Sequence, residues 1–236
     1  ISWNIYFGGW DGTCLPHDQI SMTTTSDGFG TFAAHTPIIS NGSFTNVNNP
    51  SVAVPAVGAV RMVYTTWPGG ATLNKPAYST SAGGNPPWNP ASGSTTTLLT
   101  MSGYPDWGTA DVNGTNVIYS EGSTWYLYWK AQDAVVRYST STDGANFTYQ
   151  GALLPVSDQM NQRGVNDMKK VNGSYLWAYH YNHEQVWYSV GATPTASNAT
   201  VALFNTTSEP QQGVDRCVDS IGWVASGTRL LGGGIR

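Results

Sequence analysis

The chain has 236 residues, of which 10% are charged and 12% aromatic, and its formal net charge is −4. The ten Lys and Arg residues are scattered, which argues against nucleic-acid binding, because such a surface needs clustered cations to replace counterions. No apolar run approaches the ~20 residues of a membrane span, and we expect neither a signal peptide nor a membrane span in this sequence. The length suits a single domain with a sizeable core.

The first predicted strands are Trp3–Gly9 and Gln19–Thr25, followed by an Asp-Gly turn over residues 26–32. They match the second and third strands of a pattern that recurs later, so we expect the first strand of this unit to lie before Ile1. The next unit opens at Asn49, with strands predicted over 52–54, 60–65 and 78–80.

The clearest copy of the pattern spans residues 116–149, with strands at 116–119, 125–130 and 135–140 and an Asp-Gly turn at 143–147. Another copy opens at Asp167, with strands at 168–171, 175–180 and 185–190. The last opens at Asp219 and holds two strands, 220–225 and 229–236.

The spacing of these units is 67 residues from Asn49 to Asn116, 51 from Asn116 to Asp167 and 52 from Asp167 to Asp219. Repeats of roughly 40–50 residues with four short strands are typical of propeller blades. We therefore predict an all-β fold, a single β-propeller domain over 1–236. It would have five blades, the first and last incomplete, at about 1–46, 47–108, 109–160, 161–212 and 213–236; a four-bladed ring is the alternative.

The two cysteines lie in predicted loops of the first and last blades. Cys14 falls between the second and third strands of the first blade, and Cys217 falls just before the first strand of the last. These loop classes emerge on one face of a propeller, so a Cys14–Cys217 disulfide would close the ring and stabilise it by ~4–5 kcal/mol in the entropic model. The alternative is two buried thiols.

Six Asn-x-Ser/Thr sequons indicate a secreted glycoprotein. Four of them fall at predicted turns or strand ends, where a glycan can be accommodated. The six asparagines are Asn41, Asn113, Asn146, Asn172, Asn198 and Asn205.

Polar residues open each predicted innermost strand, and these strands start near a common axis. The residues are Asn49, Asn116, Asp167 and Asp219, with Asp111 just upstream of one of them. Converging carboxylates and amides suit sugar hydroxyls, which need acceptors and donors, and paired carboxylates are what glycoside hydrolysis requires. The alternative is that each residue caps a turn through local hydrogen bonds.

The loops between second and third strands share that face and supply further candidates for contact with a glycan. We expect a rim of aromatic and polar side chains there, formed by Trp10, Asp11, Asp18, Trp67, Lys130, His180, His183 and Glu184. No spacing of metal ligands is evident, so we expect neither a metal nor a cofactor.

Three segments resemble motifs of five-bladed propeller glycosidases: residues 165–176 (VNDMKKVNGSYL), 138–144 (YSTSTDG) and 25–28 (TSDG). The family is glycoside hydrolase family 43 and its invertase-like relatives. The resemblance implies an Asp base opening the first blade, a second Asp that tunes pKa values, and a Glu acid. The base position would fall before Ile1, and no predicted inner strand opens with Glu. The catalytic candidates are therefore Asp167, Asp219 and, from a rim loop, Glu184.

Three functions remain open at this point. The chain is a secreted propeller that binds and hydrolyses a glycan in a central funnel, a glycan-binding module of the same fold that has lost its chemistry, or a glycosylated subunit of an extracellular filament or coat. The last would assemble through open blade edges, since unpaired strand edges readily recruit another chain.

Overall fold

The computed structural model describes residues 2–9, 19–27, 30–68, 73–114, 116–133, 135–154, 164–181, 185–198, 200–205, 220–226 and 229–235. For residues 9, 181, 185, 202–205, 220–226 and 229–235 it describes the backbone alone. The described strands form five separate sheets. The described residues also include one helical element, the single turn Thr95–Thr97. The described part of the chain therefore holds no helix that could cross a membrane, and the all-β prediction is confirmed.

The chain divides into two compact units. The first unit comprises Ile1–Leu127 and Thr140–Thr148, and the second comprises Tyr128–Ser139 and Tyr149–Arg236.

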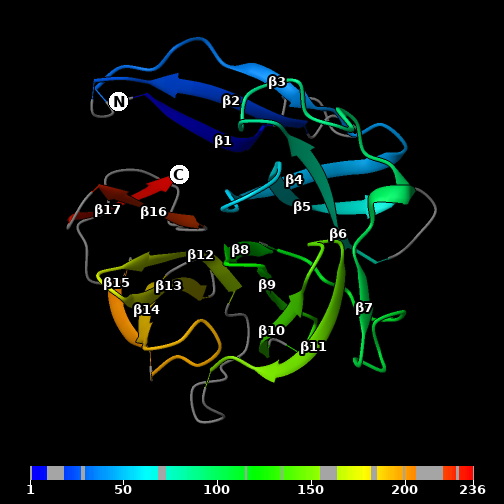
Figure 1. The fold of residues 1–236 in the computed structure, drawn as a ribbon, viewed down its shortest axis with the longest axis vertical. Coiled ribbons are helices and arrows are strands. Elements are labelled where there is room, and N and C mark those ends of the chain that lie inside the picture. Colours follow the sequence, from blue (N-terminus) through cyan, green and yellow to red (C-terminus); the bar gives the residue numbers. More distant parts are fainter. Residues whose placement is uncertain are drawn as a thin grey trace. The chain divides into compact units, whose positions relative to one another are not determined.

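Two antiparallel three-stranded sheets lie in the first unit (Figure 1). The first has the order β1-β2-β3, with bounds Trp3–Gly9, Gln19–Thr25 and Thr36–Ile39. The second has the order β4-β5-β6, with bounds Phe44–Ala53, Val60–Pro68 and Lys75–Ser81. A buried cluster that includes Ile20, Ile39, Val47, Met62 and Tyr64 joins them.

A five-stranded sheet has the order β7-β11-β10-β9-β8. Its strands are β7 Thr100–Ser102, β8 Val117–Glu121, β9 Thr124–Lys130, β10 Val136–Ser141 and β11 Asn146–Ala152. β7 comes from the long connection after β6 and pairs with β11 in parallel, with Thr100 opposite Asn146. This added strand covers the outer edge of the sheet, which would otherwise expose unpaired backbone groups.

The second unit holds an antiparallel four-stranded sheet and a two-stranded sheet (Figure 1). The former has the order β12-β13-β14-β15, with bounds Gly164–Val171, Ser174–Tyr181, Gln185–Gly191 and Val201–Asn205. The latter pairs β16 Ser220–Ser226 with β17 Arg229–Ile235.

In neighbouring sheets of each unit, the edge strands contact one another. In the first unit β4 contacts β1 and β8, and in the second unit β12 contacts β16. Each of these strands lies at the edge of its own sheet. β4, β8, β12 and β16 are the strands that the sequence analysis placed innermost, whereas β1 corresponds to a predicted second strand; the number of blades stays a prediction.

The second strand of three sheets carries a buried aromatic residue whose polar group is held by a serine of the third strand. Tyr64 bonds to Ser79 at 3.3 Å, Trp129 Nε1 donates to Ser139 Oγ at 3.0 Å, and Tyr179 bonds to Ser189 at 2.9 Å. All six side chains are at most 1% exposed. A buried hydroxyl or indole N–H needs a partner, so each serine allows a large aromatic side chain to fill the space between sheets.

The Asp-Gly turns that follow β2 and β10 are built on a fully engaged carboxylate. Asp143 Oδ1 accepts from the Ser141 hydroxyl and from the backbone N–H of Ala145 and Asn146, each at 2.8 Å. Asp27 accepts in the same way from Thr25 and from residues 30 and 31. The hydrogen bond from the Thr31 side chain does most to hold the pKa of Asp27 at about 2. Two of the segments that resemble glycosidase motifs therefore form structural turns.

Two predicted strand starts differ from the structure. β4 begins at Phe44, well before Asn49, because Phe44 and Val47 are both buried and extend the strand. β12 begins at Gly164, before Asp167. Both residues therefore lie inside a strand, next to an irregularity in its pairing.

We expect Ser189→Ala to lower the free energy of unfolding by about 1–2 kcal/mol, because it takes a hydrogen-bond partner from the buried Tyr179 hydroxyl. Tyr179→Phe combined with Ser189→Ala should recover part of that loss, since neither partner then remains. Urea unfolding of the parent, both single variants and the double variant measures the coupling. Strictly additive losses would show that the pair does not interact.

We expect Asp143→Asn to destabilise the chain by about 1 kcal/mol at pH 7, a value reduced by the exposure of the turn. Desolvation alone would raise the pKa of Asp143, but the hydrogen bonds from Asn146, Ala145 and Ser141 outweigh it and hold the pKa well below its usual value. The stabilisation is therefore present above about pH 4 and is lost as the pH falls through the folded-state pKa.

The difference between parent and Asp143→Asn should thus narrow between about pH 5 and about pH 2 in urea unfolding. Asp106→Asn, in an exposed turn of the same unit, is the matched control and should leave stability unchanged. A gap between parent and Asp143→Asn that stays constant with pH would contradict this account of the turn.

Candidate functional site

One face of β4 and β5 carries four polar or aromatic residues, which we call the amide face: Asn46, Asn48, Thr65 and Trp67. The register pairs Asn46 with Trp67 and Asn48 with Thr65. Directly paired residues of an antiparallel sheet point to the same side, as do residues two apart in one strand. Val47, which lies between the two asparagines, belongs instead to the buried apolar cluster.

The side-chain oxygens of Asn46 and Asn48 are buried without a hydrogen-bond partner. The two residues as a whole are only partly buried. A buried acceptor without a partner costs about 1–3 kcal/mol. Asparagine is also depleted in strands, so neither stability nor propensity explains this pair.

Trp67 closes the amide face at the end of β5, and its side chain is 37% exposed. An indole has an apolar body with a polar edge. An exposed ring opposite an amide offers one flat apolar surface and one hydrogen-bonding group side by side. The sequence analysis placed Trp67 in the loop after the second strand, but it lies within β5, one residue before the end of that strand.

Asn116 lies next to the amide face but is buried, with 1% of its surface exposed. Its Nδ2 donates to Thr65 Oγ1 at 2.9 Å and to the carbonyl of Gly114 at 3.3 Å. Thr65 in turn donates to the Gly114 carbonyl. This side chain fixes the segment that enters β8, which fits the turn-capping alternative better than direct contact with a ligand.

Asp111 is also hydrogen-bonded to a neighbouring segment of the chain. Its Oδ1 accepts from the backbone N–H of Asn74 at 2.7 Å and from the Asn74 side chain at 2.9 Å. The neighbouring Lys75 donates to the carbonyls of Trp107 and Ala110. Burial lowers the pKa of Lys75, and the charge of Asp111 partly opposes that shift. This group joins the chain before β6 to the chain before β8.

Asn49 marks a bulge in β4. The register of β4 shifts between Asn48 and Ser51, and Asn49 has a positive φ of 51°. A β-carbon added at Gly8 of β1 would lie 3.4 Å from the β-carbon of Asn48, so β1 passes close to this bulge. Bulges occur next to functional sites because they redirect side chains.

A second bulge lies in β12, where the register shifts between Val165 and Asp167. Asn166, the extra residue, accepts a hydrogen bond from His180 Nδ1 at 2.9 Å. Gly164 pairs with His180, and a β-carbon there would lie 2.3 Å from His180 Cε1. Glycine is therefore required at position 164 for the imidazole to fit over the strand.

Asp167 follows this bulge and is arranged as an acceptor. Its Oδ1 accepts from the backbone N–H of Met168 and from Lys169 Nζ, both at 2.8 Å. The Asp167 side chain is 15% exposed and that of Lys169 is 36% exposed. A carboxylate that is paired with an ammonium can orient a ligand or accept a proton, but is poorly placed to donate one.

Lys130, at the end of β9, is also partly buried. Burial lowers the pKa of its ammonium group. The other predicted site residues lie outside the described residues. They are Trp10, Asp11, Asp18, His183, Glu184, Asp219 and the two cysteines, Cys14 and Cys217.

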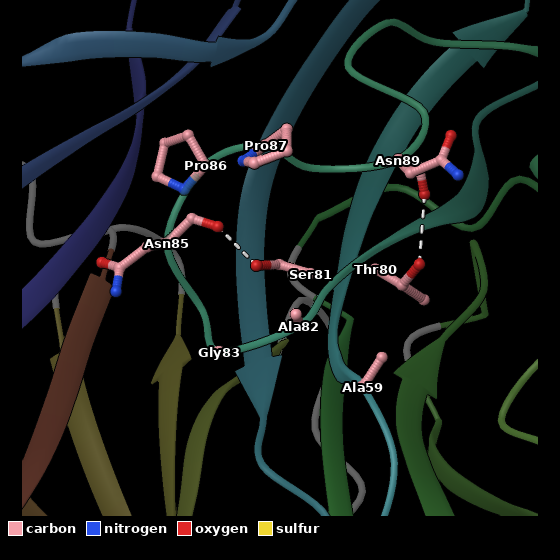
Figure 2. Close-up of a pocket in the computed structure, with 9 residues that line it drawn as sticks. All are labelled: Ala59, Thr80, Ser81, Ala82, Gly83, Asn85, Pro86, Pro87 and Asn89. Carbon is pink, nitrogen blue, oxygen red and sulfur yellow. Dashed lines mark hydrogen bonds between the residues drawn. The ribbon is translucent and has the colours of Figure 1, made fainter.

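Within the described ranges, no three His, Cys, Asp or Glu side chains come together as metal ligands would. A pocket of about 460 Å³ lies at the other end of β5 and β6, beside the loop that follows β6 (Figure 2). Ser81 donates to the Asn85 carbonyl and Thr80 to the Asn89 carbonyl. The rest of the pocket wall that the structure describes is mainly proline, alanine and glycine, and none of these described lining residues is titratable.

The sequence analysis missed Asn46 and Thr65. The alternation Asn46-Val47-Asn48 within a strand was the available signal, because it places two poor strand formers on one face. Because the sequence analysis began this unit at Asn49, Asn46 and Asn48 fell outside the predicted strand.

No protein-family model and no curated protein sequence matches this chain. Solved structures of glycoside hydrolases do resemble it. An exo-β-1,3-galactanase from Phanerochaete chrysosporium, solved with β-1,3-galactotriose, superposes with a TM-score of 0.67 at 14% identity, over 98% of this chain and 53% of the galactanase. A family 117 glycoside hydrolase from Zobellia galactanivorans gives a TM-score of 0.60 at 13% identity, over 86% of this chain and 66% of that one.

A GH43 enzyme from Xanthomonas citri complexed with xylotriose gives a TM-score of 0.53 at 18% identity, over 75% of this chain and 59% of the enzyme. At such identities the likeness concerns the fold, and this chain spans about half the length of the galactanase. The fold is accordingly an all-β propeller like that of glycoside hydrolases.

Proposed function

We propose that this chain is a carbohydrate-binding propeller of the glycosidase type, which takes an oligo- or polysaccharide on its amide face. The observation that carries the proposal is the pair of amide oxygens without partners, on Asn46 and Asn48, beside the exposed ring of Trp67. Sugar hydroxyls would supply the missing donors, and the apolar face of a sugar ring would stack on the indole.

The fold gives this proposal independent support. Two structures of similar fold were solved with sugars, β-1,3-galactotriose in one and xylotriose in the other. The amide face lies on β4, the edge strand that contacts β1 and β8, where the propeller prediction places ligand contacts. Secretion is part of the proposal, since it rests on the six sequons.

Hydrolysis of the bound glycan is the second candidate function, favoured by Asp167 after the β12 bulge. An ionised carboxylate there could act as base or electrostatic stabiliser. The proton donor would have to come from Glu184 or Asp219. A module that binds a glycan without cleaving it is the alternative, and turnover measurements separate the two.

We expect Asn48→Ala to weaken glycan binding about 3- to 10-fold, the value of one hydrogen bond. The same change should leave the free energy of unfolding unchanged or raise it, because it removes a buried acceptor that has no partner in the free protein. Isothermal titration with the best glycan from an array, together with urea unfolding, measures both effects.

Asn198→Ala, an exposed asparagine of the other unit, is the matched control and should change neither quantity. Loss of stability without loss of affinity in Asn48→Ala would assign the amide face a structural role and overturn the proposal.

Trp67→Ala should weaken glycan binding at least tenfold, as loss of an aromatic anchor does. Phe32→Ala, at another exposed aromatic residue, is the control and should leave binding unchanged.

If the chain hydrolyses its ligand, we expect Asp167→Asn to lower turnover at least about 100-fold, because it removes the charge that would accept a proton or stabilise the transition state. Affinity for the intact glycan should change far less. Aryl glycosides and polysaccharides provide the assay. Binding by the parent without turnover would identify a non-catalytic module, and equal turnover in parent and variant would remove Asp167 from the mechanism.

A further inference from the structure

The side chains of the sequon asparagines have very different surroundings in the structure. Four of the six have described side chains together with a described Ser or Thr two residues later: Asn41, Asn146, Asn172 and Asn198. The hydrogen bonds of each amide separate these four into two classes. These surroundings are the same whether or not the amide face binds a glycan.

The amides of Asn41 and Asn146 are part of the hydrogen-bonded structure. Asn41 Nδ2 donates to the carbonyl of Phe44 at 3.1 Å. Asn146 Nδ2 donates to Asp143 Oδ2 at 2.7 Å, and its Oδ1 accepts from Thr100 Oγ1 at 2.7 Å. A sugar on either nitrogen would crowd the turn before β4 or the turn between β10 and β11.

Asn172 and Asn198 are both exposed. Asn172 sits at the tip of the β12–β13 hairpin with a φ of 50°, directly before Gly173. Asn198 is anchored through its backbone N–H, which donates to the Val190 carbonyl at 2.9 Å. In both cases the backbone fixes the turn and the side chain is presented to solvent.

Both residues belong to the same end of the β12–β15 sheet. Val171 pairs with Ser174 beside Asn172, and Tyr175 pairs with Gly191, the residue next to Val190. Gly164, Asn166 and His180 mark the opposite end. The seven steps from Gly164 to Val171 place the two ends roughly 20 Å apart along the strand.

We propose that Asn172 and Asn198 carry N-linked glycans, while Asn41 and Asn146 remain unmodified. The co-reactant is a lipid-linked pyrophosphate oligosaccharide. The bond from its first sugar carbon to the pyrophosphate breaks, a bond from that carbon to the asparagine Nδ2 forms, one amide proton is released, and the lipid pyrophosphate leaves. Glycans at these positions cover one end of the sheet and leave open the end that holds Asn166, Asp167 and His180.

The test is site mapping on the full chain, secreted from a eukaryotic host behind a cleavable leader. Peptide N-glycosidase in heavy-oxygen water converts each glycosylated asparagine into labelled aspartate, which peptide mass spectrometry locates. We expect label at positions 172 and 198 and none at 41 and 146. If the parent is retained in the cell, the same peptides are read from the endoplasmic reticulum fraction.

Asn172→Gly and Asn198→Gln should each lower the intact mass by one glycan. Glycine suits the positive φ at position 172. Asn146→Gln is the matched control and should leave the glycan mass unchanged. Unlabelled Asn172 and Asn198, or label at Asn41 or Asn146 in the secreted protein, would overturn the assignment.

Discussion

The fold depends on a buried hydrogen bond between an aromatic residue of one strand and a serine of the next. It occurs as Tyr64–Ser79, Trp129–Ser139 and Tyr179–Ser189. Large aromatic side chains fill the space between small sheets, but the polar groups of tyrosine and tryptophan cannot be left without partners there. Because serine is small and carries both a donor and an acceptor, it satisfies those groups without adding volume. Burial raises the pKa of the Tyr64 hydroxyl, which keeps it neutral and able to donate.

These pairs lie on the second and third strands of their sheets, and the edge strands β4 and β12 carry other polar residues. β4 and β12 lie at the edges of their sheets and contact the edge strands of neighbouring sheets in their own units. Each contains a bulge, at Asn49 in β4 and at Asn166 in β12. The bulge in β12 is fixed by the Asn166–His180 hydrogen bond and by the absence of a side chain at Gly164. The recurrence of bulges at these strands indicates that the polar residues beside them are oriented by the backbone.

The sequence predicted the parts of the fold that repeat. The strands predicted at 116–119, 125–130 and 135–140 match β8, β9 and β10, and those predicted at 175–180 and 185–190 match β13 and β14. β11 begins inside the predicted turn at 143–147, and β12 begins before the predicted strand at 168–171. The sequence analysis did not predict the start of β4 at Phe44 or the pairing of β7 with β11, because both depend on contacts between distant segments. Asn46 and Thr65 were missed for the same reason, since their shared face follows from the register of β4 and β5.

The polar side chains of this chain fall into two groups according to whether their hydrogen-bonding atoms have partners. Asp27 and Asp143 accept several donors each and sit in turns, so their carboxylates are fully used by the fold. Asp111 and Asn116 are likewise bonded to nearby chain segments. The Oδ1 atoms of Asn46, Asn48 and Asn116 all lack a hydrogen-bond partner. Asn46 and Asn48 differ from Asn116 because they are partly exposed, whereas Asn116 is buried. A protein that gains nothing in stability from such groups keeps them at a cost of about 1–3 kcal/mol each, and a ligand that supplies donors removes that cost on binding. The proposed binding at the amide face would therefore use groups that cost the free protein stability, whereas the carboxylates of the Asp turns stabilise the fold itself.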